Sequence, residues 1–176
     1  MPATLPYIDD SLADPDMRAQ FAEIQKIMGD VPPLVRILAT VPALVPAFMG
    51  FAGPVIMGDG LSIDLKVLAL LRVSEINNCN YCRGYYAPLA EQLGLVGDRR
   101  AAIAQDVTPL ALFNPKETAL LALADEMTND IQAKPATVAK AREALGDAGT
   151  LEAMMTIGLF NLINRVAGSA GLPLEG

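Results

Sequence analysis

Two cysteines, Cys79 and Cys82, are the residues of this chain whose type and spacing most clearly allow chemistry. They are the only cysteines in 176 residues, they stand three positions apart in the segment NCNYCRGYY, and the chain contains no histidine. Two thiols at this spacing can form a reversible disulfide. The Asn77-Asn78 pair interrupts the helical pattern, so we expect Cys79 at the start of a helix, where free backbone N–H groups lower the pKa of a thiol. Arg83 adds a positive charge nearby.

Two other interpretations compete with a redox-active pair. Cysteine is a good small core residue, so both thiols could simply be packed in the interior. A zinc site normally needs four ligands, and this chain offers two thiolates and no imidazole, so zinc would require sharing across a dimer axis or added carboxylates. Because the only two cysteines fall together, the redox interpretation is favoured. No phosphate loop, dinucleotide fingerprint or serine-nucleophile motif is present, and we expect neither a metal nor a cofactor.

The elements that must position this pair are all predicted to be helices, in a single domain over residues 1–176. Asp14 followed by proline begins the first helix, which ends at Gly29. Asn114 and Glu117 form a capping box for a later one. No alternating strand pattern of useful length occurs. The other predicted helices are two or three short ones within residues 30–60, then 63–76, 79–93, 98–105, 136–145 and 150–170.

Charge and composition exclude several classes of partner. The net charge of −7 argues against nucleic acid and anionic membranes, because both would be repelled. An uncharged stretch over residues 37–58 is long enough to span a bilayer, but three prolines interrupt it, so buried short helices are expected instead. The acidic, proline-containing first residues do not resemble a signal peptide, and a cytoplasmic protein is expected. With 52% apolar residues, some apolar surface is expected between subunits of a homo-oligomer.

The segment around the cysteines resembles a known family. The stretch LALLRVSEINNCNYCRGYYAPLAEQLGL, within a core motif over residues 62–94, is similar to the core motif of the alkylhydroperoxidase D-like (AhpD-like) proteins of the carboxymuconolactone decarboxylase superfamily. It is most similar to their peroxidase-related branch. The resemblance extends to VPALVPAFMGFAGPVIMGDGLSIDLK upstream, and to ALLALADEMTND and GLFNLINRVAGSAGLPLE downstream, and so covers most of the chain after Val41.

The resemblance implies an all-α, AhpD-like fold with the C-x-x-C at the N-terminus of a central helix, assembled as trimers, dimers or hexamers. It also implies peroxide reduction by the cysteine pair. Cys82 would be the peroxidatic thiol that becomes a sulfenic acid, and Cys79 would be the resolving thiol that closes the disulfide.

The chain departs from the family pattern at two positions. Where the family has a histidine four residues after the second cysteine, this chain has Tyr86, and where it has a glutamate twelve residues before the first cysteine, this chain has Val67. Tyrosine is a poor base at neutral pH, although its hydroxyl can donate a hydrogen bond. Glu75, four residues before Cys79, is the nearest carboxylate in sequence; a substitute base and a local ion pair are equally favoured for it. Tyr86 could equally be a packing residue.

One further charged residue stands in an apolar segment. Arg165 lies in the last predicted helix, in a stretch similar to the family's, and is expected to form a buried ion pair, within the chain or across subunits. Asp125 and Glu126 are its expected partners.

The resulting expectation is a thiol-based oxidoreductase of peroxiredoxin type, with an antioxidant role. It would reduce hydroperoxides through Cys82 and Cys79 and be regenerated by a thiol or dithiol reductant. Turnover should be weak because the proton relay is altered. The alternative is a non-peroxidase homo-oligomer on the same scaffold, which binds a small apolar ligand or senses redox state. Lactone decarboxylation ranks last, because it would not need the cysteine pair and its usual acid–base histidine is missing.

Overall fold

The computed structural model describes residues 4–105 and 110–172, and within these ranges every regular element is a helix. The predicted all-α fold is therefore confirmed. In chain order the elements are α1 (Pro15–Met28), α2 (Pro33–Leu38), α3 (Leu44–Met57), α4 (Ile63–Ile76), α5 (Asn80–Tyr85), α6 (Ala87–Gln92), α7 (Gly97–Ile103), the 3-10 turn η1 (Leu110–Leu112), α8 (Pro115–Asn129) and α9 (Pro135–Ser169).

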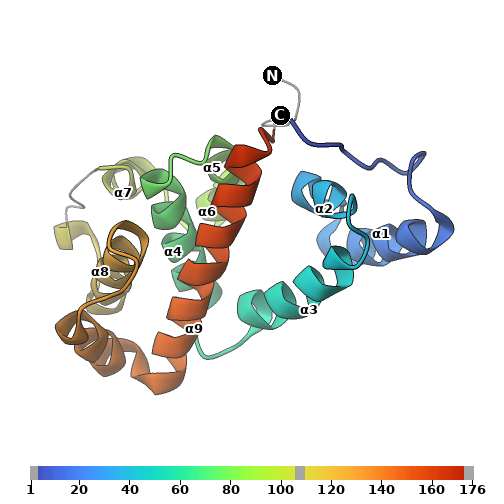
Figure 1. Ribbon diagram of the computed structural model, residues 1–176. Coiled ribbons are helices and arrows are strands. Elements are labelled where there is room, and N and C mark those ends of the chain that lie inside the picture. The colour runs from blue at the N-terminus through green and yellow to red at the C-terminus, as the bar shows by residue number, and fades with distance from the viewer. Residues whose placement is uncertain (1–3, 106–109, 173–176) are drawn as a thin grey trace.

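The helices pack around two hydrophobic clusters. Figure 1 shows α1, α2 and α3 on one side of the molecule and α4 to α8 on the other, with the long helix α9 between them. The main cluster is built largely from α4 to α9, and α9 packs against α8, α4, α3 and α5. A smaller cluster, here called the N-terminal cluster, consists of Ala13, Met17, Phe21, Ile24, Val31, Val35, Ala39 and Val45.

Helix α4 lies at the centre of the main cluster and leads directly to the cysteines. Its residues from Leu65 to Ser74 are all buried, including Lys66 and Arg72. Both cations are satisfied: the Lys66 ammonium donates to the Gly58 carbonyl at 2.6 Å and pairs with Glu152 at 3.0 Å. The Arg72 guanidinium pairs with Asp125 of α8 and donates to backbone carbonyls at the end of α7. Because buried charges are costly unless paired, these contacts fix α4 against four neighbouring segments.

Several predicted helix ends are confirmed. Asp14 caps α1 by accepting a hydrogen bond from the Met17 backbone N–H at 2.7 Å. The capping box of α8 is present, with both the Asn114 and the Glu117 side chain bonded to the other residue's backbone. Gly29 follows α1 with a φ of 88°, a left-handed conformation that favours glycine.

The single helix predicted over residues 79–93 is wrong, because the structure has two short helices that meet at Tyr86. Pro88 stands in the first turn of α6. Its nitrogen carries no hydrogen to donate, and its ring would clash with the carbonyl four residues earlier, at Gly84, if the helix continued. The break at Tyr86 therefore follows from a proline.

The two helices predicted over residues 136–145 and 150–170 form the two halves of α9. The backbone leaves helical geometry at Gly146, which has a φ of 74° and a ψ of 174°. The expected break is thus confirmed as a kink, and it is compatible with glycine because other residues rarely adopt a positive φ.

The uncharged stretch over residues 37–58 forms the end of α2, a turn and the whole of α3. Among residues 4–105 and 110–172, no helix has the length and apolar character needed to cross a membrane.

Within the chain, the buried ion pair predicted for Arg165 is wrong. Its side chain is exposed and donates to the Asn161 side chain and carbonyl one turn earlier in α9. Asp125 is engaged by Arg72, and Glu126 pairs with Lys134 at 3.3 Å. The face of α9 that carries Arg165 points to solvent, so the arginine needs no buried carboxylate.

Candidate active site

The turn between α4 and α5 positions the cysteines. Asn78 has a φ of 52°, and the backbone N–H of Asn78 and Cys79 donate to the carbonyls of Glu75 and Ser74 at 3.0 and 2.9 Å. These two bonds with a left-handed residue between helix and turn form a Schellman motif, which ends α4 and reverses the chain. Asparagine tolerates this conformation better than most residues. The predicted interruption at Asn77-Asn78 is confirmed, and it delivers Cys79 to the N-cap of α5.

The two thiols are free and in contact. Their Sγ atoms lie 2.8 Å apart, and Cys79 Sγ accepts a hydrogen bond from the Cys82 backbone N–H at 3.3 Å. Both side chains are buried, with 3% of Cys79 and none of Cys82 exposed. The pair is therefore a dithiol held close to disulfide geometry and shielded from bulk water.

The two thiols differ in their pKa values, and so in how readily each gives up its proton. A hydrogen bond from the Cys82 thiol lowers the pKa of Cys79 to about 7; burial opposes this shift, while the Cys82 N–H and the charge of Arg83 add to it. The pKa of Cys82 is raised by its hydrogen bond to Cys79, by burial and by the negative charge on Cys79. When the pair loses one proton, the remaining proton therefore stays on Cys82 and the negative charge lies on Cys79.

A group of buried and half-buried polar side chains lies next to Cys82. Asn164 of α9 donates from Nδ2 to Cys82 Sγ at 3.0 Å and to Ser74 Oγ at 3.3 Å, and its Oδ1 accepts from Asn77 at 3.2 Å. Hydrogen bonds from Asn164 and Ser74 act to lower the pKa of Cys82, against the larger opposing effects. Sequence reasoning missed these residues. The available signal was the pair Asn161 and Asn164, two amides one turn apart in an otherwise apolar helix.

Glu75 forms the local ion pair that was one of its two expected roles. Its carboxylate accepts from Arg83 at 2.7 Å and from Arg100 of α7 at 2.6 Å, and only 9% of the side chain is exposed. Burial acts to raise the pKa of Glu75, but the hydrogen bonds and charges of the two arginines lower it. A carboxylate so engaged is a weak base, and Glu75 instead holds Arg83 beside Cys79.

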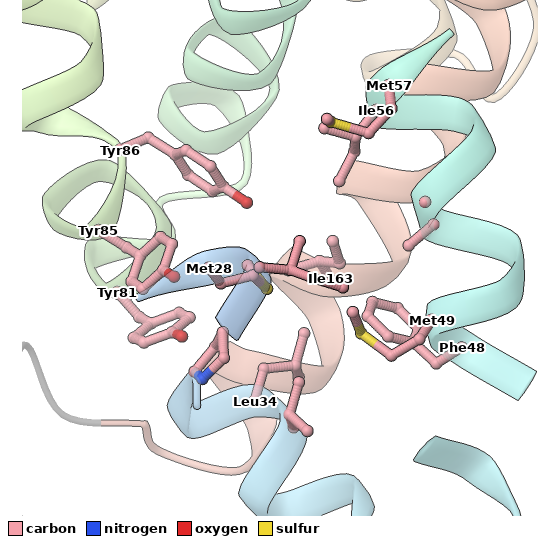
Figure 2. Close-up of a pocket in the computed structure, with 15 residues that line it drawn as sticks. Met28, Leu34, Phe48, Met49, Ile56, Met57, Tyr81, Tyr85, Tyr86 and Ile163 are labelled. Carbon is pink, nitrogen blue, oxygen red and sulfur yellow. The ribbon is translucent and has the colours of Figure 1, made fainter. Parts of the chain in front are cut away.

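Tyr86 lies at the edge of an apolar cavity of about 150 Å³. Figure 2 shows Tyr81, Tyr85 and Tyr86 pointing toward this cavity from the cysteine-bearing side, with Phe48 and Met49 of α3 on the opposite side. Every lining residue that belongs to the described part of the chain is uncharged; these residues are Ile27, Met28, Pro32, Leu34, Val35, Phe48, Met49, Ala52, Gly53, Ile56, Met57, Tyr81, Tyr85, Tyr86 and Ile163.

Burial, followed by the charges of Tyr85 and Cys82, raises the pKa of Tyr86. Its ring also packs edge-on against Phe160 of α9, with centroids 5.3 Å apart. The hydroxyl therefore stays protonated and can donate a hydrogen bond, but it cannot act as a base at neutral pH. Both expected roles of Tyr86, packing and hydrogen-bond donation, are compatible with this position.

No carboxylate occupies the position of the family's relay glutamate. Val67 is buried there, and it lines a small cavity together with Lys66 and Tyr86. The Lys66 ammonium points away toward the carbonyls of Ile56 and Gly58. Within the described ranges, no group of three or more histidine, cysteine, aspartate or glutamate side chains could hold a metal ion.

None of the known protein-family models matches the chain, and no curated protein sequence matches it. Solved structures do share its fold. An uncharacterized peroxidase-related protein from Silicibacter sp. TM1040 has a TM-score of 0.79 at 23% identity, over 98% of this chain and 94% of that chain. A peroxidase-related protein from Ralstonia eutropha JMP134, described as an alkylhydroperoxidase AhpD core, has a TM-score of 0.78 at 23% identity, over 98% and 93%.

A third structure with this fold is an enzyme with a different reaction. The debrominase Bmp8, solved as a cysteine-to-alanine variant in complex with 2,3,4-tribromopyrrole, has a TM-score of 0.80 at 18% identity, over all of this chain and 94% of that chain. At such identities these similarities establish the fold, and they confirm the expected resemblance at that level.

Proposed function

Because the chain has the AhpD-like fold of peroxidase-related proteins, we propose that it is a thiol-based oxidoreductase that reduces hydroperoxides with Cys82 and Cys79. One observation carries the proposal: two free thiols have their sulfurs 2.8 Å apart, and one of them has a pKa of about 7. A thiolate is then present at neutral pH, and its partner is in place to close a disulfide.

In the proposed reaction the Cys82 thiolate attacks the terminal oxygen of the hydroperoxide. An S–O bond forms, the O–O bond breaks, and the departing alkoxide takes up one proton to become an alcohol, which leaves Cys82 as a sulfenic acid. The Cys79 thiolate then attacks this sulfur, the S–O bond breaks, and the departing hydroxide gains a proton to become water. A thiol or dithiol reductant returns two electrons and two protons to the disulfide.

The surroundings of the two sulfurs support these roles. Cys82 lies close enough to Tyr86 to raise the pKa of the phenol, and the protonated Tyr86 hydroxyl would donate to the departing oxygen. Cys79 is the sulfur with the lower pKa, so the negative charge must pass to Cys82 before the peroxide is attacked. The proton on Cys82 moves to Cys79 when a substrate arrives, which places the charge on the attacking sulfur. Glu75 serves by holding Arg83, and takes no proton itself.

The cavity favours an organic hydroperoxide over hydrogen peroxide. A volume of about 150 Å³ with an apolar wall matches the space that holds a benzene-sized molecule in other proteins. A hydroperoxide with a neutral apolar body would bury that body against the side chains of α3 and present its O–O bond to the tyrosine side. Charged substrates would lose hydration without gaining an ion pair.

The proposed enzyme needs a reductant for its disulfide, and we expect it to be a homo-oligomer. A reducing compartment such as the cytoplasm supplies the thiol or dithiol that reopens the disulfide. A homo-oligomer is supported by exposed apolar side chains on α9, here called the α9 stripe: Leu151, Met155 and Leu162, which are 60%, 37% and 49% exposed. Their spacing places them on one face of the helix.

The test is stopped-flow loss of thiols after reduced protein is mixed with cumene hydroperoxide or hydrogen peroxide. In the wild-type protein we expect two thiols to be oxidised per chain, and the reaction to be faster with cumene hydroperoxide than with hydrogen peroxide. The Cys79→Ser variant should keep this fast phase, but its single thiol should become a sulfenic acid that dimedone traps. Cys82→Ser should abolish the phase. Thiols that react no faster than free cysteine would refute the peroxidase reaction.

Tyr86→Phe tests the proposed donor. The substitution removes the hydroxyl and keeps the ring contact with Phe160, so the oxidation rate should fall about tenfold, the value of one lost hydrogen bond, with little change in melting temperature. An unchanged rate would assign Tyr86 to packing alone.

A second candidate reaction is reductive dehalogenation of a small aromatic compound. It is favoured by the uncharged cavity that Tyr81, Tyr85 and Tyr86 of the cysteine-bearing segment help to line, and by the fold shared with a debrominase. The dithiol would supply two electrons and one proton to replace carbon-bound bromine by hydrogen, with release of bromide, a proton and the disulfide. Bromide release from 2,3,4-tribromopyrrole, measured by ion chromatography, decides for this reaction; binding without turnover would favour a ligand-binding protein.

A further inference from the structure

The amides of Asn164, Asn77 and Asn161 form a connected, partly buried group next to Cys82, to which the proposed reaction assigns no role. Asn164 Nδ2 lies 3.0 Å from Cys82 Sγ, and Asn77 Nδ2 lies 3.2 Å from Asn164 Oδ1 and 3.0 Å from Asn161 Oδ1. Asn161 in turn donates to Thr128 of α8 at 3.1 Å. Asn164 is 3% exposed, so water does not replace these contacts.

The contacts determine which end of the Asn164 amide faces the sulfur. An amide has a donor end and an acceptor end, and the two can exchange by a half-turn of the side chain. Here Oδ1 accepts from Asn77, whose Nδ2 also donates to Asn161, so Nδ2 of Asn164 is left to donate to Cys82. Asn77 ends α4 immediately before the turn that carries the cysteines, which ties this orientation to the cysteine-bearing segment.

The two sulfurs have separate sets of donors. Cys79 Sγ accepts from the Cys82 backbone N–H and lies near the charge of Arg83. Cys82 Sγ is fully buried and accepts from the side chain of Asn164, with the Ser74 hydroxyl also close to it. Ser74 donates its hydroxyl proton to the Leu70 carbonyl at 2.7 Å, so Asn164 is the donor that is committed to the sulfur.

We propose that Asn164 is a catalytic residue whose amide N–H stabilises negative charge on Cys82 Sγ, and that Asn77 is the positioning residue that keeps this N–H turned toward the sulfur. The inference deepens the proposed function, on which it rests, by naming what replaces the missing histidine. Asn164 takes no proton. It favours the form of the pair in which Cys79 holds the proton and Cys82 the charge, and the proton crosses the 2.8 Å between the sulfurs.

The test isolates Cys82 by using the Cys79→Ser background, which contains a single thiol. The protein is labelled with [13Cβ]cysteine, and the pKa of Cys82 is read from its carbon shift as a function of pH. Asn164→Ala should raise this pKa by about one to two units, which is about ten- to hundredfold less thiolate at neutral pH. Asn164→Asp should raise it further, because a carboxylate would face the thiolate.

Asn77→Ala tests the positioning role in the same background. It frees the Asn164 amide to turn, so the pKa of Cys82 should rise, but by less than in Asn164→Ala. Thr156→Val is the matched control. Thr156 is a buried α9 residue whose hydroxyl has no hydrogen-bond partner, so its removal should leave the pKa of Cys82 unchanged. Melting temperatures are recorded for every variant.

The measurement does not depend on peroxide turnover, so failure of the proposed function and failure of this inference can be told apart. If both Asn164 variants remain folded and the pKa of Cys82 stays within about 0.3 units of the parent, the donor role is refuted, because even a weak hydrogen bond would exceed that shift. If Asn164→Ala shifts the pKa but Asn77→Ala does not, the positioning role is refuted. If Asn164→Ala does not fold, the isosteric Asn164→Asp decides.

Discussion

Cys79 and Cys82 have different surroundings although their sulfurs are in contact. A backbone N–H and the charge of Arg83 act on Cys79, whereas two side-chain donors and a tyrosine lie near Cys82. Because the thiols share a proton, each pKa belongs to the pair, and a change at one sulfur is felt at the other. Reactivity is thus set by neighbours from α4, α5 and α9 together.

Cys82→Ala should weaken the Cys79 thiolate. The strongest cause of the lowered pKa of Cys79 is the Cys82 thiol, so without this donor the pKa should rise from about 7 toward its ordinary value of 9.0. The rate of iodoacetamide alkylation would then have its midpoint at a higher pH. Cys82→Ser is the control, because its hydroxyl can still donate. Equal midpoints in the alanine and serine variants would contradict the proton-sharing account.

Glu75→Gln separates the ion-pair role of Glu75 from that of a base. Loss of the carboxylate leaves two half-buried arginines unpaired, so the free energy of unfolding should fall by about 1–3 kcal/mol. Arg83 keeps its contact with Asn78 at 2.9 Å and becomes a less compensated positive charge, so the pKa of Cys79 should fall further. Urea denaturation and the alkylation profile measure these effects.

A base would behave in the opposite way. If Glu75 accepted the thiol proton, Glu75→Gln would slow alkylation and peroxide reduction at neutral pH. A slower reaction in a stable variant would therefore restore the base role that was expected equally from the sequence.

At the scale of elements, the turn between α4 and α5 depends on one left-handed residue. Asn78, with its φ of 52°, allows the cysteines to follow α4 directly and still begin a new helix. An alanine at this position should cost about 1 kcal/mol of stability, because the left-handed conformation strains its Cβ. Asn78→Gly is the matched control: it also loses the contact to Arg83 but carries no strain. Urea denaturation should give a larger free energy of unfolding for the glycine variant than for the alanine variant, and the reverse order would contradict the conformational argument.

Local patterns in the sequence predicted most of these elements. Caps, prolines and hydrophobic spacing depend on residues close in the chain. The ends of α1, the start of α8 and the break before Cys79 could therefore be predicted from the sequence. The split at Tyr86 was missed because the helical pattern was given more weight than Pro88. The contact of Asn77 with Asn164 joins residues 87 positions apart, and no local pattern records it. For the same reason, the sequence left the role of Glu75 open until α7 brought Arg100 to it.

At the scale of the whole molecule, exposed apolar surface is the feature that a monomer would not need. The α9 stripe lies on the solvent face of a helix whose other faces are buried in the main cluster. Covering it with a second copy would remove apolar area from water, which is the main source of stability in homo-oligomers.

Leu162→Glu should dissociate the proposed assembly. Sedimentation velocity of the wild-type protein should give a multiple of the 18.6 kDa chain mass, and the variant should approach the mass of one chain, because a buried carboxylate without a partner is costly. Leu12→Glu is the control, since Leu12 is 68% exposed and lies before α1, away from the stripe. A wild-type protein that sediments as one chain would rule out the homo-oligomer.

The cavity beside the tyrosines lies where the N-terminal cluster and the main cluster meet. Its wall includes Val35 of the N-terminal cluster on one side and Tyr81 and Ile163 of the main cluster on the other. A bound molecule would therefore contact both clusters, and the free energy of binding would oppose their separation. Local opening of α1, measured by amide hydrogen exchange, should be uncoupled from global unfolding in the empty protein and should require global unfolding when the cavity is filled. Bound substrate would then join the two clusters into a single cooperative unit.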